Sequence, residues 1–466
     1  MNIEQIYTGC LAQGAYYIES DGEAIIIDPL REPQPYMDRL QRDGAELKYI
    51  LETHFHADFV SGHLNLSQLT GAPIVFGPTA APDFDAHIAT DGEEFNVGKL
   101  TIRVLHTPGH TMESTTYLLL NEQGKEHAIF TGDTLFLGDV GRPDLAQKGM
   151  ELTMEDLAGT LYDSLRNKIM PLPDTVTVYP AHGAGSACGK NMSKETVGTL
   201  GNQKATNYAL DASLSKKDFV AQLIDGLEAP PEYFPHNVRL NKSGYQTTQE
   251  ITDRGLQALS TEQFEQAAND TGAVVLDVRH QSEFVQGFVP RSIFIGIDGG
   301  FAPWVGSLIG DTDTPLLLVI PNGREEETVT RLARVGFDYV VGYLDGGFAA
   351  WQASGKEIDT LKSITAETFA DTIETDPTAH IVDVRKPGEW EAGHVNKASH
   401  APLAAISKNS DVYKSEGTNY IHCAGGYRSV IAASILKSRG IHNVVDVQGG
   451  YAAIKKTNAP RVEPVA

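Results

Sequence analysis

Short apolar runs, separated by glycine and proline turns, recur through the N-terminal part of the chain. Between Met154 and Leu165 the spacing changes, because apolar residues return at helical intervals behind Thr153, a suitable N-cap. The N-terminal part is therefore predicted to mix strands and helices. The predicted strands are Ala24–Asp28, Tyr49–Glu52, Pro73–Phe76, Leu100–Leu105, Thr115–Leu120, His127–Phe130 and Thr175–Tyr179.

After residue 190 the pattern becomes helical and polar, and a proline-bearing stretch, Ala229–Pro235, leads into residues 237–244. The apolar period is lost near Tyr245–Asp253, which we interpret as a linker. The N-terminal domain is accordingly predicted to span residues 1–245.

An internal repeat follows this linker. Its copies match in three places roughly 105 residues apart: Ala273–Arg279 with Ile381–Arg385, Ser260–Phe264 with Thr365–Phe369, and Asp345–Phe348 with Gln448–Tyr451. In each copy a buried strand ends in Asp-x-Arg, and apolar and helical segments alternate after it. This pattern predicts a small α/β domain with a parallel sheet. We call residues 255–357 the first repeat and residues 363–460 the second repeat.

Charge and length narrow the possible partners. A chain of 466 residues has room for roughly two to four domains. Its 61 acidic and 37 basic residues give a formal charge of −24, which disfavours nucleic acid and anionic membranes as partners. Met1–Leu11 lacks a targeting pattern and no run approaches a membrane span, so we expect a cytoplasmic protein without a membrane partner. Three scattered cysteines describe no disulfide framework.

Candidate metal ligands gather after several predicted strands: His54, His56, Asp58, His110, Asp133 and His182. The first three alternate in the sequence THFHAD and would project to one side of an extended segment. All six side chains could meet at one end of a sheet. Spacing alone does not decide which of them would bind a metal directly.

The pattern resembles the HxHxD motif of the metallo-β-lactamase superfamily, which implies an αββα sandwich. That motif usually continues with a histidine after the aspartate, where this chain has Phe59. Because a phenyl ring cannot bind a metal, we expect one ion per chain. Resemblance to the persulfide dioxygenase branch implies Fe(II) held by His54, His110 and Asp133, a facial triad with open positions, with zinc as the alternative metal.

The same resemblance assigns roles to residues around the metal. His56, Asp58 and His182 would orient the ligands or line the pocket. Sequence position suggests two further roles. Arg142, soon after Asp133, would bind an anionic group of the substrate, although a solvated turn arginine explains it equally well. Cys188 follows His182 on a glycine-rich loop and would bind or gate substrate or carry a sulfane sulfur, with an inert thiol as the equal alternative.

Cys423 begins a second candidate site, the loop CAGGYRS between the apolar run Asn419–His422 and a predicted helix over Val430–Leu436. Backbone N–H groups at a helix start stabilise a thiolate, and Arg428 adds positive charge. The loop resembles the active-site loop of rhodaneses, which implies that Cys423 carries sulfane sulfur as a persulfide. The alternatives are a buried structural cysteine and a phosphatase loop, which would need one more residue between Cys423 and Arg428.

The first repeat has no cysteine, so we expect it to be structural, or secondarily to bind a partner or effector.

The predicted fold class is therefore a multi-domain α/β chain, in which an αββα metallo-β-lactamase sandwich precedes two α/β rhodanese domains with parallel sheets. The predicted activity is persulfide oxidation coupled to sulfurtransferase activity. Expected partners are thiol persulfides of the glutathione or coenzyme A type, thiosulfate or sulfite, and O₂, and we expect a homo-oligomer. One rival is a binuclear-zinc, glyoxalase II-like thioester hydrolase with a regulatory rhodanese pair. Another is a sulfide-responsive binding module, which the intact Cys423 loop disfavours.

Overall fold

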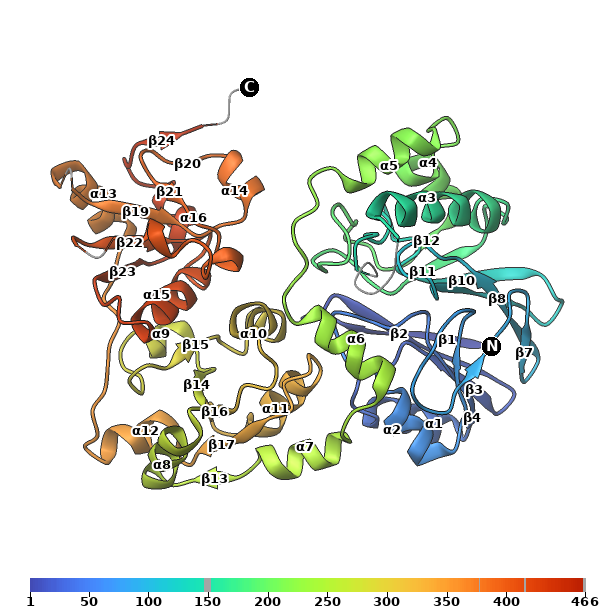
Figure 1. The fold of residues 1–466 in the computed structure, drawn as a ribbon, viewed down its shortest axis with the longest axis horizontal. Helices are drawn as coiled ribbons and strands as arrows, with labels where there is room; N and C mark the ends of the chain where they lie inside the picture. The colour runs from blue at the N-terminus through green and yellow to red at the C-terminus, as the bar shows by residue number, and fades with distance from the viewer. Residues whose placement is uncertain (146–151, 377, 415, 464–466) are drawn as a thin grey trace. The chain divides into compact units, whose positions relative to one another are not determined.

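The structure is a computed structural model that describes residues 1–145, 152–376, 378–414 and 416–463 (Figure 1). The chain divides into two compact units, residues 1–248 with 332–336, and residues 249–331 with 337–466. The first unit contains the candidate metal ligands, and the second contains most of both repeats. Within the described ranges, no helix is long and apolar enough to cross a membrane.

Two mixed six-stranded sheets form the centre of the first unit. The first sheet runs in chain order: β1 (Asn2–Thr8), β2 (Gln13–Ser20), β3 (Glu23–Ile27), β4 (Glu46–Leu51), β5 (Ile74–Phe76) and β6 (His87–Ile88). The second runs in reverse chain order: β12 (Gly198–Thr199), β11 (Thr177–Pro180), β10 (Glu126–Gly132), β9 (Thr115–Leu120), β8 (Leu100–His106) and β7 (Glu94–Val97). All seven predicted strands are present, whereas the antiparallel pair β1 and β2 was not predicted.

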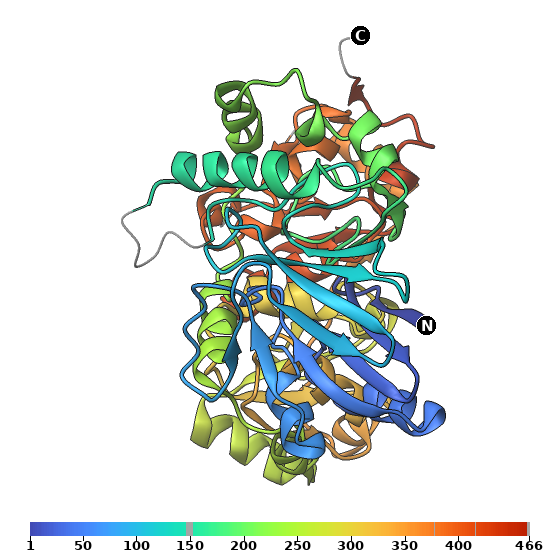
Figure 2. The ribbon, with the colours of Figure 1, turned by 90° about the vertical axis from the view of Figure 1, so that its right-hand side faces the viewer.

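Helices cover the outer face of each sheet and complete the αββα sandwich (Figures 1 and 2). They are α1 (Gln34–Asp43) and α2 (His63–Thr70) on the first sheet, and α3 (Met154–Ser164), α4 (Leu200–Thr206) and α5 (Lys216–Ile224) on the second. Strand β3 shows how the sequence fixes these layers. Ile25 and Ile27 point into the core between the sheets, whereas Ala24 and Ile26 point into the core beneath α1 and α2. Both faces of the strand are thus buried, which explains its unbroken apolar run.

The predicted linker is largely helical. After α6 (Phe234–Ser243), helix α7 (Thr248–Gly255) occupies much of the Tyr245–Asp253 segment. This helix buries only Ile251 and Gly255. So little burial leaves no apolar period in the sequence, which is why the helix itself was not predicted. The boundary between the two compact units, at residues 248 and 249, falls within the predicted linker.

Each repeat contains a five-stranded parallel sheet, as predicted. The first has the order β13 (Ala258–Leu259), β17 (Val340–Leu344), β16 (Leu316–Val319), β14 (Val274–Asp277), β15 (Ile293–Phe294). Its helices are α8 (Thr261–Thr271), α9 (Gln281–Phe284), α10 (Phe301–Ile309), α11 (Glu325–Ala333) and α12 (Gly347–Ala353).

The second sheet has the same strand arrangement: β18 (Ser363–Ile364), β23 (Val444–Val447), β22 (Asn419–His422), β19 (His380–Asp383), β21 (Ser399–His400). Its helices are α13 (Ala366–Thr375), α14 (Pro387–Glu391), α15 (Arg428–Ser438) and α16 (Gly450–Ile454). A small separate sheet pairs β20 (His394–Val395) with β24 (Arg461–Val462).

The repeated sequence segments meet around one buried ion pair in each sheet. In the first repeat, Arg279 Nη2 donates to Asp277 Oδ2 at 2.6 Å, and its guanidinium lies 4.3 Å from the centroid of the Phe348 ring. In the second repeat the same contacts are made by Arg385, Asp383 and Tyr451. The Asp-x-Arg and Gly-Gly-aromatic segments recur in both repeats because together they form the same ion pair and the same arginine–aromatic contact in each.

Candidate active sites

The candidate metal ligands lie in loops that leave the two sheets. His54 follows β4, His110 follows β8, Asp133 follows β10 and His182 follows β11. Strands β8, β10 and β11 run in the same direction, because β9 is antiparallel to both β8 and β10, and β11 is parallel to β10. Their carboxyl ends therefore bring three candidate ligands to one edge of the second sheet.

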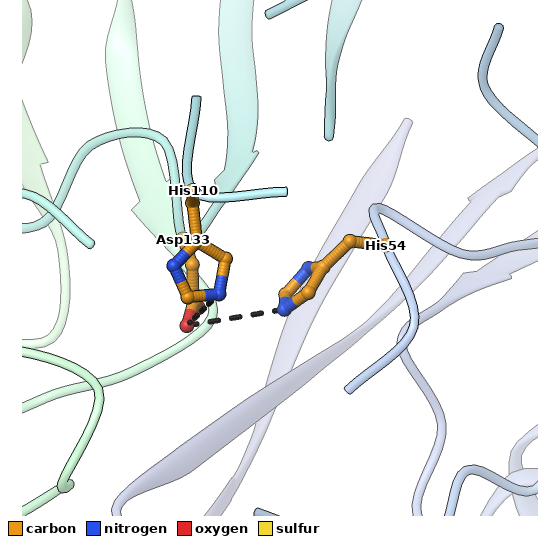
Figure 3. Close-up of side chains that lie close together, drawn as sticks. All are labelled: His54, His110 and Asp133. Carbon is orange, nitrogen blue, oxygen red and sulfur yellow. Dashed lines mark ion pairs between the residues drawn. The ribbon is translucent and has the colours of Figure 1, made fainter. Parts of the chain in front are cut away.

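Figure 3 shows His54, His110 and Asp133 pointing toward one another. Asp133 Oδ2 lies 3.4 Å from His110 Nε2 and 3.9 Å from His54 Nε2, and all three side chains are buried. Among the described residues, neither carboxylate oxygen of Asp133 has a hydrogen-bond partner. Burial, reinforced by the nearby imidazoles, holds the pKa of His54 well below its usual range. A neutral imidazole beside an unpartnered buried carboxylate fits a bound metal ion.

Hydrogen bonds fix how the two imidazoles face this point. His110 Nδ1 lies 2.7 Å from the carbonyl oxygen of Arg142, which can only accept, so Nδ1 carries the proton and Nε2 is free to bind metal. His54 Nδ1 lies 2.9 Å from Thr53 Oγ1. Because the Thr53 hydroxyl donates to Asp28 Oδ2 at 2.8 Å, it accepts from His54 and leaves Nε2 of that ring free as well.

The motif THFHAD forms a loop in the structure, not the extended segment that we predicted, and the rings of His54 and His56 lie with their centroids 4.2 Å apart. His56 Nε2 lies 3.1 Å from Asp28 Oδ1 and 3.6 Å from Glu52 Oε2. Burial would lower the pKa of His56, but the surrounding carboxylates outweigh it and raise this pKa to about 9. The Phe59 ring packs on His56, with centroids 4.3 Å apart. Phe59 thus covers an imidazole that is held by carboxylates.

Asp58 and His182 complete the pocket. His182 Nε2 lies 3.5 Å from Asp58 Oδ2 and 3.5 Å from Asp133 Oδ1. Burial raises the pKa of Asp58. The ligating atoms of His56, Asp58 and His182 are close enough together to form a second possible metal cluster. The roles that we predicted for these three residues stay predictions.

Two further predicted residues lie close to the ligands. The Arg142 guanidinium donates to Asp144, Ala187 O and Glu228 O, so protein groups already occupy it. The thiol of Cys188 is buried, its Sγ lies within 4.8 Å of possible ligand atoms of Asp133 and His182, and burial raises its pKa well above the usual range. Substrate binding by Arg142 and Cys188 stays a prediction.

Sequence reasoning missed several residues that support the site. Asp28 ends a predicted strand with φ +49°, and a carboxylate at the end of an apolar run could have marked it. Asn241 on α6 gave no such signal. Its Nδ2 donates to the carbonyls of His56 and Phe59 at 2.8 Å, and its Oδ1 accepts from the Ser61 backbone at 2.8 Å. A distant helix therefore fixes the loop that follows His54.

The second candidate site lies in the second repeat, where β22 delivers Cys423 to the start of α15. The Cys423 thiol is buried, and Sγ accepts from the Gly426 backbone N–H at 3.1 Å. Arg428 donates to both carboxylate oxygens of Glu389, at 2.7 and 2.8 Å. This pairing lowers the pKa of Glu389 to about 2. The expected loop and helix are present, and Glu389 is a supporting residue that we did not predict.

The first repeat has another loop at the corresponding place. It follows β16, and its Arg324 pairs with Asp298 at 2.6 Å and with Glu327 at 2.9 Å. The sequence contains no cysteine between residues 188 and 423. The first repeat therefore cannot form a cysteine persulfide.

The fold and the two sites define a metallo-β-lactamase domain joined to two rhodanese-like domains. The metallo-beta-lactamase superfamily description matches residues 8–182, and the rhodanese-like domain description matches residues 260–354 and 365–457. These ranges lie within the three predicted domains, whose exact limits stay predictions.

Individual relatives refine this class. Human persulfide dioxygenase ETHE1, mitochondrial, is 32% identical over 230 residues, which are 48% of this chain and 81% of that protein. The cytoplasmic hydroxyacylglutathione hydrolase of Arabidopsis thaliana is 30% identical over 37% of this chain and 65% of that protein. A metallo-beta-lactamase structure from Staphylococcus aureus subsp. aureus COL is 29% identical, covers 73% of this chain and 98% of that chain, and has a TM-score of 0.63. The chain belongs to the persulfide dioxygenase family, extended by two rhodanese-like domains.

Proposed function

We propose that the first unit oxidises a thiol persulfide with O₂ to thiol and sulfite, and that the second repeat transfers sulfane sulfur through Cys423. His54, His110 and Asp133 would hold one Fe(II) ion. The observation that carries this proposal is the buried triad, in which Asp133 has no hydrogen-bond partner among the described residues, while Phe59 packs against His56. A hydrolase of the binuclear type would need a second metal ion to generate hydroxide. In the second possible cluster, His56 is held by Asp28 and Glu52 and covered by Phe59, which disfavours a second ion there.

Iron would supply the redox chemistry that O₂ activation requires and that zinc cannot supply. The oxidation balances as RSSH + O₂ + H₂O giving RSH, sulfite and two protons. His54 and His110 would present unprotonated Nε2 atoms, because Thr53 and the Arg142 carbonyl accept their Nδ1 protons. Asp58 and His182, 3.5 Å apart beside Asp133, would take up a proton that the substrate releases. The burial of all these groups excludes bulk water from the reacting atoms.

Sulfur transfer would use the Cys423 thiolate as a nucleophile. It attacks the outer sulfur of RSSH, the S–S bond breaks, and RSH leaves with a proton. Sulfite then attacks the outer sulfur of the Cys423 persulfide, which releases thiosulfate and restores the thiolate. The Gly426 N–H directed at Sγ and the positive charge of Arg428 would stabilise the anion at each stage.

A thiol of the glutathione or coenzyme A type would carry the persulfide. The similarity to a hydroxyacylglutathione hydrolase favours glutathione, because that relative is named for a glutathione thioester. Glutathione persulfide is therefore the substrate to test first.

The test measures metal content and O₂ uptake with glutathione persulfide. We expect about one iron per chain in the native protein, and loss of both iron and O₂ uptake in His110→Ala. His106→Ala is the matched control, since His106 lies on β8 and contacts the Met112 carbonyl, outside the triad. Two zinc ions per chain, with thioester cleavage and no O₂ uptake, would overturn the dioxygenase assignment.

A further inference from the structure

Tyr427, in the loop that begins at Cys423, reaches out of its own domain. Its hydroxyl donates to the carbonyl oxygen of Gly296 in the first repeat at 2.8 Å. Its ring meets Phe294 edge-on, with centroids 5.8 Å apart. The ring also lies so close to Gly299 that a Cβ there would be 2.3 Å from Tyr427 Cζ. A residue of the sulfur-transfer loop is thus seated in the domain that has no cysteine.

Tyr427 lines a cavity of about 230 Å³ at the carboxyl edge of the first repeat's sheet. Besides Tyr427 it is lined by residues that follow β14 and β15: Arg279, His280, Gln281, Gly296, Asp298 and Gly299. The second repeat places Cys423 at the same edge of its own sheet. Tyr427 therefore contacts the first repeat at the sheet edge that corresponds to the one at which the second repeat carries Cys423.

A second contact fixes the helix that the loop begins. Ser434 on α15 is fully buried, and its Oγ accepts from the Phe294 backbone N–H at 2.9 Å. Helix α15 thus packs beside β15 of the first repeat. Tyr427 and Ser434 hold the start and the middle of the same helical segment against one surface.

The anchored position matters because of its neighbours in sequence. Gly426, directly before Tyr427, donates its N–H to Cys423 Sγ, and Arg428, directly after it, pairs with Glu389. Gly426 has φ +96°, a backbone region that glycine can leave easily. The contacts of Tyr427 with the first repeat restrain the residue next to this N–H from outside the loop.

We propose that Tyr427 is a positioning residue through which the first repeat holds the sulfur-transfer loop of the second repeat in its reactive conformation. The proposal rests on the proposed sulfur transfer. It gives the first repeat a role in the reaction of the second, without any thiol of its own.

Three variants test the contact from both sides, with transfer from thiosulfate as the assay. Tyr427→Ala removes the anchor, and Gly299→Ala displaces it from the first repeat without changing the loop. We expect each to lower kcat/KM about tenfold. Tyr427→Phe keeps the ring and loses one neutral hydrogen bond, so a loss of about threefold is expected. Gly300→Ala is the matched control, since a Cβ there would face Trp304 and not Tyr427.

A double variant separates positioning from general destabilisation. If Gly299→Ala acts by moving Tyr427, it has no further effect on kcat/KM in the Tyr427→Ala background. Fully additive losses in the double variant, or wild-type kcat/KM in Tyr427→Ala, would overturn the proposal. Thermal unfolding of each variant confirms that the comparison is between folded proteins.

Hydrogen exchange of residues 424–430 provides a readout that does not depend on turnover. We expect it to be about tenfold faster in both Tyr427→Ala and Gly299→Ala than in the native protein. If Cys423→Ser leaves sulfur transfer unchanged, the proposed function fails, but exchange still reports the anchoring. Unchanged exchange in both variants contradicts the positioning role itself.

Discussion

Thr53 joins a proposed metal ligand to a carboxylate deeper in the protein. Its hydroxyl accepts from His54 Nδ1 and donates to Asp28, while its backbone N–H donates to the other Asp28 oxygen at 2.7 Å. Asp28 also faces His56. One buried carboxylate therefore sets the proton position on His54 and stabilises the charge on His56.

Replacing Thr53 with valine keeps the shape of the side chain and removes this relay. We expect Thr53→Val to weaken iron binding by about 10–100-fold, with a parallel loss of O₂ uptake at limiting iron. Competition with a chelator measures the affinity. Thr116→Val is the control, because the buried Thr116 hydroxyl hydrogen-bonds to Thr107 and, within the described residues, to none of the proposed metal ligands. Unchanged iron affinity in Thr53→Val would show that His54 needs no such relay.

Glu389 makes the stability of the Cys423 site depend on pH. Its pKa in the folded protein, about 2, lies below the ordinary value of 4.5 because Arg428 pairs with it. The stabilisation by this pair is therefore fully present above about pH 4.5 and is lost as the pH falls toward 2. Since the Glu389 side chain is 35% exposed, solvent screening limits the stabilisation to about 1 kcal/mol or less.

Glu389→Gln should accordingly lower the urea midpoint at neutral pH, and the difference from the native protein should shrink below pH 4.5. Tryptophan fluorescence follows the transition, since Trp390 is the next residue on α14. A difference that stays constant down to pH 3 would mean that the variant acts through something other than the charge of Glu389.

At the scale of elements, each repeat has a glycine with positive φ at the start of its last helix, and the surroundings of this glycine differ between the two repeats. Gly450 begins α16 with φ +53°, and a Cβ there would lie 2.3 Å from the Cys423 carbonyl oxygen. Gly347 begins α12 with φ +60°, but its Cβ would lie 3.3 Å from the nearest atom, the Ile320 carbonyl oxygen. The positive φ favours glycine at both positions. Only at Gly450 would a side chain also collide with the backbone of the loop that begins at Cys423.

Gly347→Ala and Gly450→Ala should therefore introduce similar backbone strain but have different effects on sulfur-transfer activity. We expect both to lose about 1–2 kcal/mol of stability from the positive φ. Gly450→Ala should in addition abolish most sulfur transfer, because the new methyl group displaces the Cys423 carbonyl. Thermal unfolding and transfer from thiosulfate check the two expectations separately. Equal activities in the two variants would contradict the argument.

The elements also show where sequence reasoning succeeds and where it stops. The strand Thr115–Leu120 was found because its sequence TTYLLL consists of β-branched, aromatic and apolar residues, every one of which is buried. β1 was missed because its residues are mostly half-buried, and the pattern is correspondingly weak. The sequence THFHAD shows which possible ligands are present. It does not show where their side chains point, because Asn241, on a helix far away in the sequence, fixes the conformation of that loop. Contacts between segments far apart in sequence leave no periodic signal.

At the scale of the whole molecule, the two units would contribute two consecutive reactions. The proposed oxidation in the first unit would yield sulfite, and the proposed Cys423 persulfide in the second would accept attack by sulfite. Together the two reactions would convert two RSSH, O₂ and water into two RSH, thiosulfate and two protons. Neither reaction requires the product to stay bound, because sulfite can diffuse between the sites.

This balance predicts that Cys423→Ser changes the product but not the oxidation. The native protein should consume two persulfides for each O₂ and release thiosulfate, whereas Cys423→Ser should consume one and release sulfite, because the second persulfide is used only at Cys423. An oxygen electrode, with chromatography of sulfite and thiosulfate, measures both quantities. Asp133→Ala is the opposite control and should stop O₂ uptake while sulfur transfer from thiosulfate continues. Thiosulfate as the product of Cys423→Ser would show that the two sites do not divide the reaction in this way.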